Sequence, residues 1–301
     1  MNLCQIQQIE TLSRDETFIA SFELAVKKTI AEFKLIEPND KVLVAVSGGK
    51  DSTVLLYVMK KLGYDVEALT IDVHIGCYTK QNFENIKKFC AQLGVKLHAF
   101  SFREEYGYSV CYITSLLKEK NKPLGSCTVC GVLRRRILNR AAREAGFSKI
   151  ATGHNLDDEA QTIFMNIIKN KMDLNARLGP NPSLVEDDGF VQRIKPLYFI
   201  PEEDISKYSK MHAFPVHYGR CPCSLSSTRN TLRSLLAPPE IKYNIMSWFR
   251  KNLPIIREKF KGTGVLGRCS VCSEPASSSV CRACSIVQDI KSPEPAEFLR
   301  S

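Results

Sequence analysis

Residues 42–62, VLVAVSGGKDSTVLLYVMKKL, form the stretch of this chain that decides its fold. A valine-rich run typical of a buried strand gives way within a few residues to a run with helical character. Between them, the glycines of SGGKDS (47–52) let the backbone turn tightly, so that its N–H groups point outward at the positive end of the next helix. This predicts a strand–turn–helix unit that binds an anion, although the Walker A pattern G-x-x-x-x-G-K-S/T is absent. A turn whose serine and aspartate side chains only cap the helix is the alternative.

The same alternation of strand-like and helix-like segments continues along the chain. Short β-branched runs predict strands at 41–46, 66–73, 97–102 and 149–153. Longer helical stretches that end in glycine separate these runs. Elements of these lengths in this order predict an α/β fold, with a parallel, doubly wound sheet covered by helices on both faces.

The remaining segments complete the predicted organisation. A stretch rich in Asn, Pro and Gly at 171–195 predicts a loop over one end of the sheet. Further helices are predicted at 13–35, 201–214, 226–237 and 239–260, and a short strand at 215–218. The predicted units are an N-terminal helical segment (1–38), the α/β domain (39–237), a helical extension (238–262), a cysteine-rich ribbon (263–290) and a disordered end (291–301).

Charge and cysteine content narrow the class of protein. The chain has 42 Lys+Arg against 32 Asp+Glu and a net charge of +10, which favours a polyanionic partner, nucleic acid first, over a merely solvated basic surface. No apolar run approaches the roughly 20 residues needed to span a bilayer, and the N-terminus lacks the apolar core of a secretory signal. We therefore expect a cytoplasmic protein without membrane association. In a reducing compartment, its 12 cysteines are expected to include metal or catalytic sites rather than a disulfide framework.

The cysteine-rich ribbon carries a regular pattern, C-x2-C-x8-C-x2-C. Two such knuckles joined by a short loop bring four thiolates within tetrahedral reach of one ion, which predicts a closed structural Zn²⁺ site. The metal would supply folding energy that a short tail cannot obtain from a core of its own. The predicted ligands are Cys269, Cys272, Cys281 and Cys284.

A second cysteine group is less regular. Cys127 and Cys130 are expected just before a helix, and Cys221 and Cys223 follow in GRCPCS, at the end of the sheet where the glycine turn lies. The residues alone leave a redox pair, a second zinc site and an iron–sulfur site open. The other cysteines of the α/β domain are interpreted as small core residues: Cys77, Cys90 and Cys111.

Charged residues accompany this group. On a helix that begins near Gly131, Arg134 falls within the apolar face, where it needs a partner because an unpaired buried charge is costly. Arg136, Arg140 and Arg143 form the opposite stripe, either as a solvated face or as contacts for RNA phosphates.

Acidic residues begin the helix that follows the strand at 149–153. Asp157 and Glu159 are interpreted as complements of the helix dipole. Arg229 and Arg233, four residues apart, are either phosphate contacts or an exposed helix face.

Two motifs together carry a family resemblance. SGGKDS (47–52) and ATGHNLDDEAQT (151–162) resemble the ATP pyrophosphatases with a HUP-type α/β domain, which split ATP into AMP and pyrophosphate. The resemblance covers most of residues 40–237, and with the cysteines the chain looks like the tRNA 2-thiouridine synthetases of the TtuA/NcsA type. It implies that 39–237 is a PP-loop domain that binds ATP and Mg²⁺. The residues implied for ATP are Ser47, Gly48, Gly49, Lys50, Asp51 and Ser52.

The resemblance also implies a [4Fe–4S] cluster. Its implied ligands are Cys127, Cys130 and Cys221, which leave one iron without a protein ligand. Cys223 stands where an aromatic residue is commoner, and it is interpreted as a bystander rather than a fourth ligand or a sulfur relay.

The resemblance also implies roles for two charged residues, because of the positions that they occupy in the motifs. Arg134 stands where relatives have a basic residue, often Lys, with a catalytic or phosphate-binding role, and a structural salt bridge is the alternative. Asp158 matches a catalytic or Mg²⁺-associated carboxylate.

The implied reaction is ATP-dependent thiolation of a tRNA uridine, in which adenylation of the base precedes displacement of AMP by sulfur. The implied partners are tRNA, a sulfur donor that is either a ubiquitin-like carrier protein or free sulfide, and a second copy of the chain in a homodimer. The ribbon sequence favours uridine 54 of the T-loop slightly over uridine 34 of the anticodon. Two other functions stay open: an ATP pyrophosphatase that activates another base or small acid, and a zinc-ribbon RNA-binding protein without catalysis.

Overall fold

A computed structural model describes residues 3–182, 187–219, 221–224, 228–260 and 266–291. The disordered end expected at 291–301 lies, apart from its first residue, outside the described residues. No helix in the described part of the chain is both long and apolar enough to cross a membrane.

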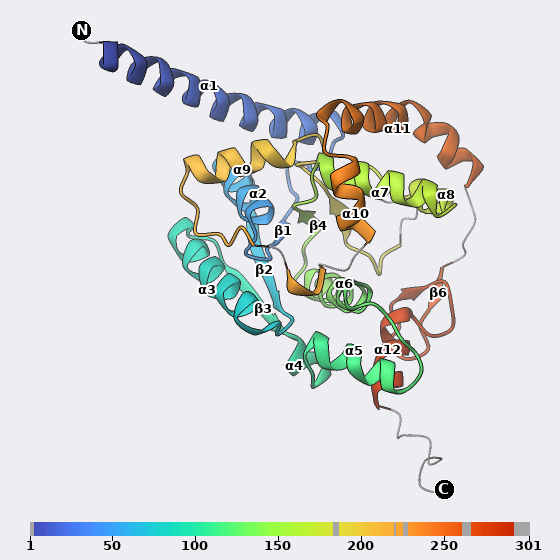
Figure 1. Cartoon of the computed structure of the whole chain (residues 1–301). Coiled ribbons are helices and arrows are strands. Elements are labelled where there is room, and N and C mark those ends of the chain that lie inside the picture. The colour runs from blue at the N-terminus through green and yellow to red at the C-terminus, as the bar shows by residue number, and fades with distance from the viewer. Residues whose placement is uncertain (1–2, 183–186, 220, 225–227, 261–265, 292–301) are drawn as a thin grey trace, which may run out of the picture.

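A five-stranded parallel sheet forms the centre of the molecule (Figure 1). Its order is β3-β2-β1-β4-β5. The strands are β1 (Val42–Ala45), β2 (Val66–Asp72), β3 (Leu97–Ser101), β4 (Lys149–Thr152) and β5 (Gln192–Ile194). β1 and its neighbours read as continuous apolar runs because helices cover both faces of the sheet. The strands predicted at 41–46, 66–73, 97–102 and 149–153 and the doubly wound α/β class are confirmed.

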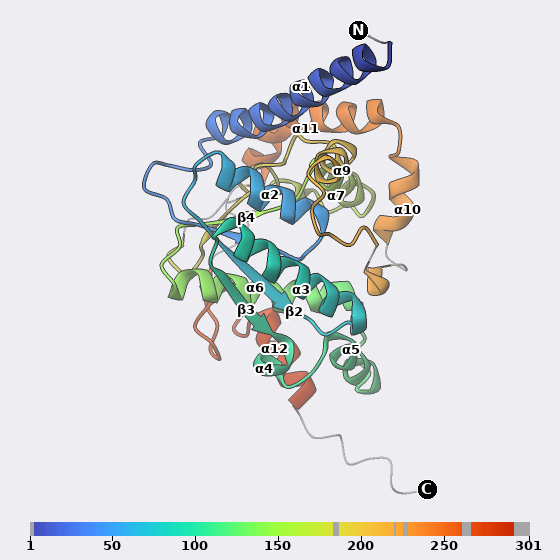
Figure 2. The same cartoon turned by 90° about the vertical axis from the view of Figure 1, so that its left-hand side faces the viewer.

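Helices pack on both faces of this sheet. On one face lie α1 (Leu3–Glu32), α2 (Lys50–Lys61), α3 (Gly76–Leu93) and α9 (Glu202–Met211), whose apolar residues share one buried cluster with β1 (Figure 2). On the other face, α6 (Ser126–Glu144) packs Leu138 and Ala142 against Leu43 and Ile150. α1 runs further toward the N-terminus than the helix predicted at 13–35, and it buries Phe22 and Val26 as the spacing predicts.

The helical extension and the ribbon surround this core. α7 (Leu156–Ile168) and α8 (Met172–Asn175) pack against α11 (Pro239–Lys259), and α10 (Thr228–Leu235) contacts α7. α4 (Phe102–Tyr106) and α5 (Val110–Glu119) lie beside α6, against which α12 (Arg282–Lys291) also packs. The ribbon hairpin consists of β6 (Gly267–Arg268) and β7 (Pro275–Ala276).

The structure overturns three predictions about elements. The loop predicted at 171–195 contains α8 and the edge strand β5, both too short for their periodicity to be seen. Residues 215–218, predicted as a strand, have no strand assignment. α6 begins at Ser126 rather than near Gly131, so that Cys127 and Cys130 lie inside the helix. Gly125 is its N-cap, and Gly131 is accommodated within the helix rather than starting it.

Candidate active site

The glycine turn joins β1 to α2 as predicted. Its conformation is held from within: the Ser47 backbone N–H donates to Ser52 Oγ at 3.1 Å, and that hydroxyl donates to the Gly49 carbonyl at 3.1 Å. Gly48 has φ +79°, and a Cβ on it would lie 2.6 Å from the Asn82 carbonyl of α3. Only glycine satisfies both the left-handed backbone and this close approach.

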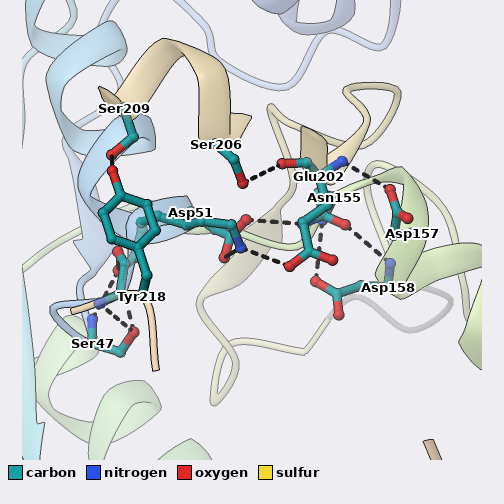
Figure 3. A network of polar contacts seen from close by, with 12 residues as sticks. Ser47, Asp51, Asn155, Asp157, Asp158, Glu202, Ser206, Ser209 and Tyr218 are labelled. Carbon is teal, nitrogen blue, oxygen red and sulfur yellow. Dashed lines mark hydrogen bonds and ion pairs between the residues drawn. The ribbon is translucent and has the colours of Figure 1, made fainter. Parts of the chain in front are cut away.

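A network of charged groups lies directly behind the turn. Lys50 Nζ is 3.1 Å from Asp51 and 2.7 Å from Glu202 at the start of α9. Figure 3 shows Asp51, Asn155 and Glu202 turned toward one another from the starts of three helices. Asn155 Nδ2 donates to Asp51 at 3.0 Å, and Arg233 of α10 contacts the second oxygen of Glu202. Arg233 therefore lies in the site, whereas the side chain of Arg229 is outside the described residues.

Carboxylates outnumber the ammonium in this network. Burial raises the pKa of Asp51, the positive charge of Lys50 opposes this, and Asp158 and Glu202 add to the rise. For Lys50, burial alone would lower the pKa, but Asp51 and Glu202 together raise it above its usual value. The two directions agree physically, because three carboxylates, Asp51, Asp158 and Glu202, share only the Lys50 ammonium and the Arg233 guanidinium among the described residues. An arrangement of this kind has capacity for a further cation.

The start of α7 brings the family's acidic motif to the same place. Asn155 and Asp158 form a capping box: the Asp158 backbone N–H donates to Asn155 Oδ1 at 3.0 Å, and the Asn155 backbone N–H donates back to Asp158 at 3.4 Å. The preceding Gly153 approaches the glycine turn so closely that a Cβ would lie 2.9 Å from the Ser52 nitrogen. The capping box and this close approach fix the position of Asp158 relative to the turn.

Asp157 and Glu159 do more than complement the helix dipole. Both are buried, Asp157 in an ion pair with Lys242 of α11 and Glu159 in one with Lys195 at 2.6 Å. Asp157 also accepts the backbone N–H of Glu202 at 2.8 Å. These contacts tie α7, α9 and α11 together, a role that sequence spacing does not reveal.

One pocket of about 160 Å³ connects the glycine turn with the cysteines. Residues from five segments line it. Among them are one residue from the glycine turn, one from α3 and three from the segments that carry cysteines: Ser47, Asn82, Cys130, Arg134 and Cys221. The prediction that the cysteine segments lie at the same end of the sheet as the turn is confirmed. The carboxyl ends of parallel strands meet at one edge, and the connecting segments converge there.

Arg134 lies one turn after Cys130 in α6, and both residues line the pocket. Burial raises the pKa of Cys130, while the Arg134 guanidinium opposes this and the nearby Cys221 and Cys127 add to it. In the described part of the chain Arg134 forms no ion pair with a carboxylate. Its charge faces thiols inside the pocket.

Cys223 lies beside the pocket and not in its lining. Its Sγ is 3.8 Å from Cys111 Sγ, and Cys127 Sγ donates to its carbonyl at 3.6 Å. Burial, then the contact with Cys111, raises the pKa of Cys223 to about 12. Cys90 is buried as predicted, but Cys77 and Cys111 are exposed, so the prediction of core positions was wrong for both. Single cysteines have no periodicity from which burial can be inferred.

The predicted arginine stripe of α6 is not merely solvated. Arg140 pairs with Glu105 of α4, and Arg143 pairs with Glu274 of the ribbon, both at 2.5 Å. Asn139 donates to the same Glu274 at 3.0 Å. The stripe therefore holds the ribbon and α4 against α6.

The ribbon brings its four predicted ligands together. The sulfur atoms of Cys269, Cys272, Cys281 and Cys284 all lie within 4.8 Å of one another. The backbone N–H of Cys281 donates to Cys269 Sγ at 3.2 Å, and this contact, together with further hydrogen bonds, lowers the pKa of Cys269 to about 6 despite burial. Four converging sulfur donors with backbone N–H support fit a tetrahedral Zn²⁺ ion.

Comparisons with known proteins agree with this geometry. Residues 20–240 match the family model described as a PP-loop domain. The chain is 34% identical over 275 residues to the tRNA-5-methyluridine(54) 2-sulfurtransferase of Pyrococcus horikoshii, covering 90% of this chain and 86% of that protein. It is 32% identical over 282 residues to the cytoplasmic tRNA 2-thiolation protein 1 of Caenorhabditis elegans, covering 91% of this chain and 74% of that protein.

A solved structure extends the likeness to three dimensions. The U34-tRNA thiolase NcsA from Methanococcus maripaludis, determined with its [4Fe-4S] cluster, superimposes with a TM-score of 0.73 at 29% identity. The match covers 94% of this chain and 91% of that one. The chain belongs to the PP-loop family and, within it, to the tRNA thiolases of the TtuA/NcsA type.

Proposed function

We propose that this chain catalyses the ATP-dependent 2-thiolation of a tRNA uridine. One observation carries the proposal: Ser47 of the glycine turn lines the same pocket as Cys130, Arg134 and Cys221. A nucleotide-activating loop and sulfur-bearing groups that share one pocket suit a reaction in which an activated base meets a sulfur nucleophile.

We place the phosphates of ATP on residues 47–52, where backbone N–H groups and the N-terminus of α2 would face the anion. Lys50 adds positive charge, and Asp51 and Asp158 would hold Mg²⁺, which would offset the negative charge of the phosphates. The uridine O2 attacks the α-phosphorus and pyrophosphate leaves. AMP is then a better leaving group from C2 than an oxide, so that sulfur displaces it. Arg134 stabilises negative charge in the pocket but is a poor proton donor.

Cys127, Cys130 and Cys221 supply the donor set for a [4Fe–4S] cluster. Cys127 and Cys130 lie in the first turns of α6, and Cys221 joins Cys130 in the lining of the pocket. Three thiols beside the Arg134 guanidinium fit a cluster that carries negative charge. Bound there, the cluster would supply an iron with a position open to a sulfur ligand. Cys223, engaged with Cys111, is the weaker choice for the third ligand.

The remaining assignments rest on relatives and composition. Zn²⁺ in the Cys4 group is structural, because protein ligands fill all four positions. We infer uridine 54 as the target, slightly ahead of uridine 34, in line with the name of the Pyrococcus relative. A ubiquitin-like carrier protein or free sulfide is the donor, the functional unit is a homodimer, and the protein is cytoplasmic.

Nucleoside mass spectrometry of tRNA treated with the anaerobically purified protein, ATP, Mg²⁺ and sulfide tests the proposal. We expect 2-thiouridine with wild type and none with Cys127→Ala, Cys130→Ala or Cys221→Ala. Cys77→Ala, which removes an exposed thiol that does not line the pocket, is the matched control and should retain activity.

Iron and acid-labile sulfide analysis separates the alternatives. A PP-loop enzyme that activates another base or small acid would contain zinc in place of iron in the central cysteine group. A non-catalytic RNA-binding protein would not convert ATP to AMP in the presence of tRNA. Thiolation that persists in all three cysteine variants would refute the assigned mechanism.

A further inference from the structure

A second cavity, of about 220 Å³, lies beside α6 where the α/β domain meets the ribbon. Three arginines line it: Arg135 and Arg136 from α6 and Arg193 from β5. Phe190, which is 43% exposed, and Glu274 also line the cavity. None of these residues belongs to the pocket of the glycine turn.

Within the described ranges of the chain, no carboxylate pairs with the arginines of this cavity. In the described part of the chain, neither Arg135 nor Arg193 has an ion pair or a side-chain hydrogen bond to a carboxylate. Glu274, the one carboxylate in the lining, already contacts Arg143 and Asn139. Arg136 faces the Cys284 thiol and Arg135 faces the Cys130 thiol. Neither thiol is a carboxylate, so the arginines of this cavity have no carboxylate partner among the described residues.

Burial and the like charge of Arg135 lower the pKa of Arg193 to about 10. A guanidinium so placed is still charged at neutral pH, and its desolvation is costly unless an anion accompanies it. Two arginines that line one cavity suit the oxygens of a phosphate group, because each guanidinium can donate two parallel hydrogen bonds.

The walls of the cavity are held in place by contacts that do not involve these arginines. Arg268 of the ribbon pairs with Asp187 at 3.0 Å, and Asn139 donates to the Gly189 carbonyl at 2.7 Å. These contacts join the ribbon, the loop before β5 and α6. The cavity is therefore a built feature rather than a gap between loosely associated parts.

We propose that this cavity binds a phosphodiester of the RNA substrate, with Arg135 and Arg193 on the phosphate and Phe190 as a stacking surface for an adjacent base. The inference rests on the proposed function and names where the RNA backbone is held. Two features favour RNA over a small anion. An exposed aromatic ring beside arginines is the combination with which proteins hold unpaired nucleotides. Arg135 also directly follows Arg134 in α6, so a strand held here is next to the thiolation pocket.

The test measures tRNA affinity of the full chain against salt concentration. Arg193→Gln and Arg135→Gln are each expected to weaken binding roughly tenfold, the effect of losing one charged hydrogen-bonding group. Each should also reduce the slope of log K against log salt by about 0.7 to 0.9. Arg193→Lys, which keeps the charge, should recover part of the affinity. Arg14→Gln, an exposed arginine on α1, is the matched control and should change neither quantity.

Two further arms identify the source of the phosphate. Inorganic phosphate and pyrophosphate are titrated against wild type and Arg193→Gln by calorimetry. Millimolar-range binding lost in Arg193→Gln, with tRNA affinity unchanged, would overturn the RNA assignment in favour of a free anion. Unchanged tRNA affinity and salt slope in both glutamine variants, with no anion binding, would overturn the site altogether.

The outcome is distinguishable from failure of the proposed function. If wild type neither binds nor thiolates tRNA, the proposed function fails. If wild type thiolates tRNA and the arginine variants bind it normally, only the phosphodiester site fails. Circular dichroism and thermal melting of each variant check that its fold is intact, and ATP affinity should be unchanged because the glycine turn is untouched.

Discussion

Gly48→Ala tests whether the glycine turn is shaped by its contact with α3. Gly48 has φ +79°, and a Cβ built on it would lie 2.6 Å from the Asn82 carbonyl and 2.7 Å from the Asn82 Cβ. Gly63, just after α2, has a similar φ of +85°, but a Cβ there meets nothing within 4 Å. The two glycines therefore share the backbone strain and differ only in the close approach.

The expected costs follow from this difference. An alanine in the left-handed region costs about 1–2 kcal/mol at either position. The forced displacement of Asn82 adds about 1–3 kcal/mol at Gly48 alone, as for an extra methyl group in a packed interior. We expect Gly48→Ala to lower the free energy of unfolding by about 2–5 kcal/mol and Gly63→Ala by about 1–2 kcal/mol.

Urea unfolding of the two variants and wild type at equal metal content measures these values, and AMP formation from ATP measures the effect on the turn. Gly48→Ala should lose most turnover, because the displaced backbone N–H groups no longer face the phosphates, while Gly63→Ala keeps it. Equal destabilisation of the two variants, within about 0.5 kcal/mol, would refute the reasoning. So would normal turnover in Gly48→Ala.

Three further predictions concern buried charge, metal and pH. Lys195→Met should lower the free energy of unfolding by about 3–5 kcal/mol, because it removes the buried ammonium 2.6 Å from Glu159. The double variant Lys195→Met/Glu159→Met should recover much of the lost free energy of unfolding, as measured by urea unfolding. A double variant no more stable than Lys195→Met would contradict the role assigned to this ion pair. Cys272→Ser should reduce the zinc content by one ion per chain in elemental analysis. It should also make the ribbon sensitive to limited proteolysis, while the central sheet and its helices stay resistant to the protease. Unchanged zinc would exclude the Cys4 site. For Glu67, burial opposes ionisation, but hydrogen bonds from His98 and Lys96 hold its pKa below its usual value. Glu67→Gln should therefore cost stability at neutral pH, and the difference from wild type should close as pH falls through that lowered pKa, as checked by unfolding at several pH values.

Much of the fold was predictable because its signals are local. The turn at 47–52 needs glycine for a positive φ, and valine-rich runs of strand length mark strands buried on both faces. Four strands and most long helices were predicted for this reason. β5 and α8 were missed because a segment of three or four residues has no measurable periodicity, and the start of α6 was misplaced because Gly131 lies within a helix.

The candidate site also combines features that the sequence predicts with contacts that it does not predict. The spacing of Cys269, Cys272, Cys281 and Cys284 predicts a common metal because a short chain cannot place them far apart, and their sulfur atoms do converge. Nothing local predicts that Cys111 approaches Cys223, or that Lys195 reaches Glu159 in the interior. Those contacts join segments far apart in the sequence.

The sequence by itself therefore determined the glycine turn, the parallel sheet and the four-cysteine knuckle, because each depends on a short stretch of residues. Only the tertiary structure decided that Cys221 lines the pocket of Ser47 and Cys130 while Cys223 does not, and that Arg193 of the edge strand joins Arg135 of α6 in one cavity. The physical reason is that strand order and helix packing set which side chains meet. Both depend on burial of the whole chain rather than on any local pattern.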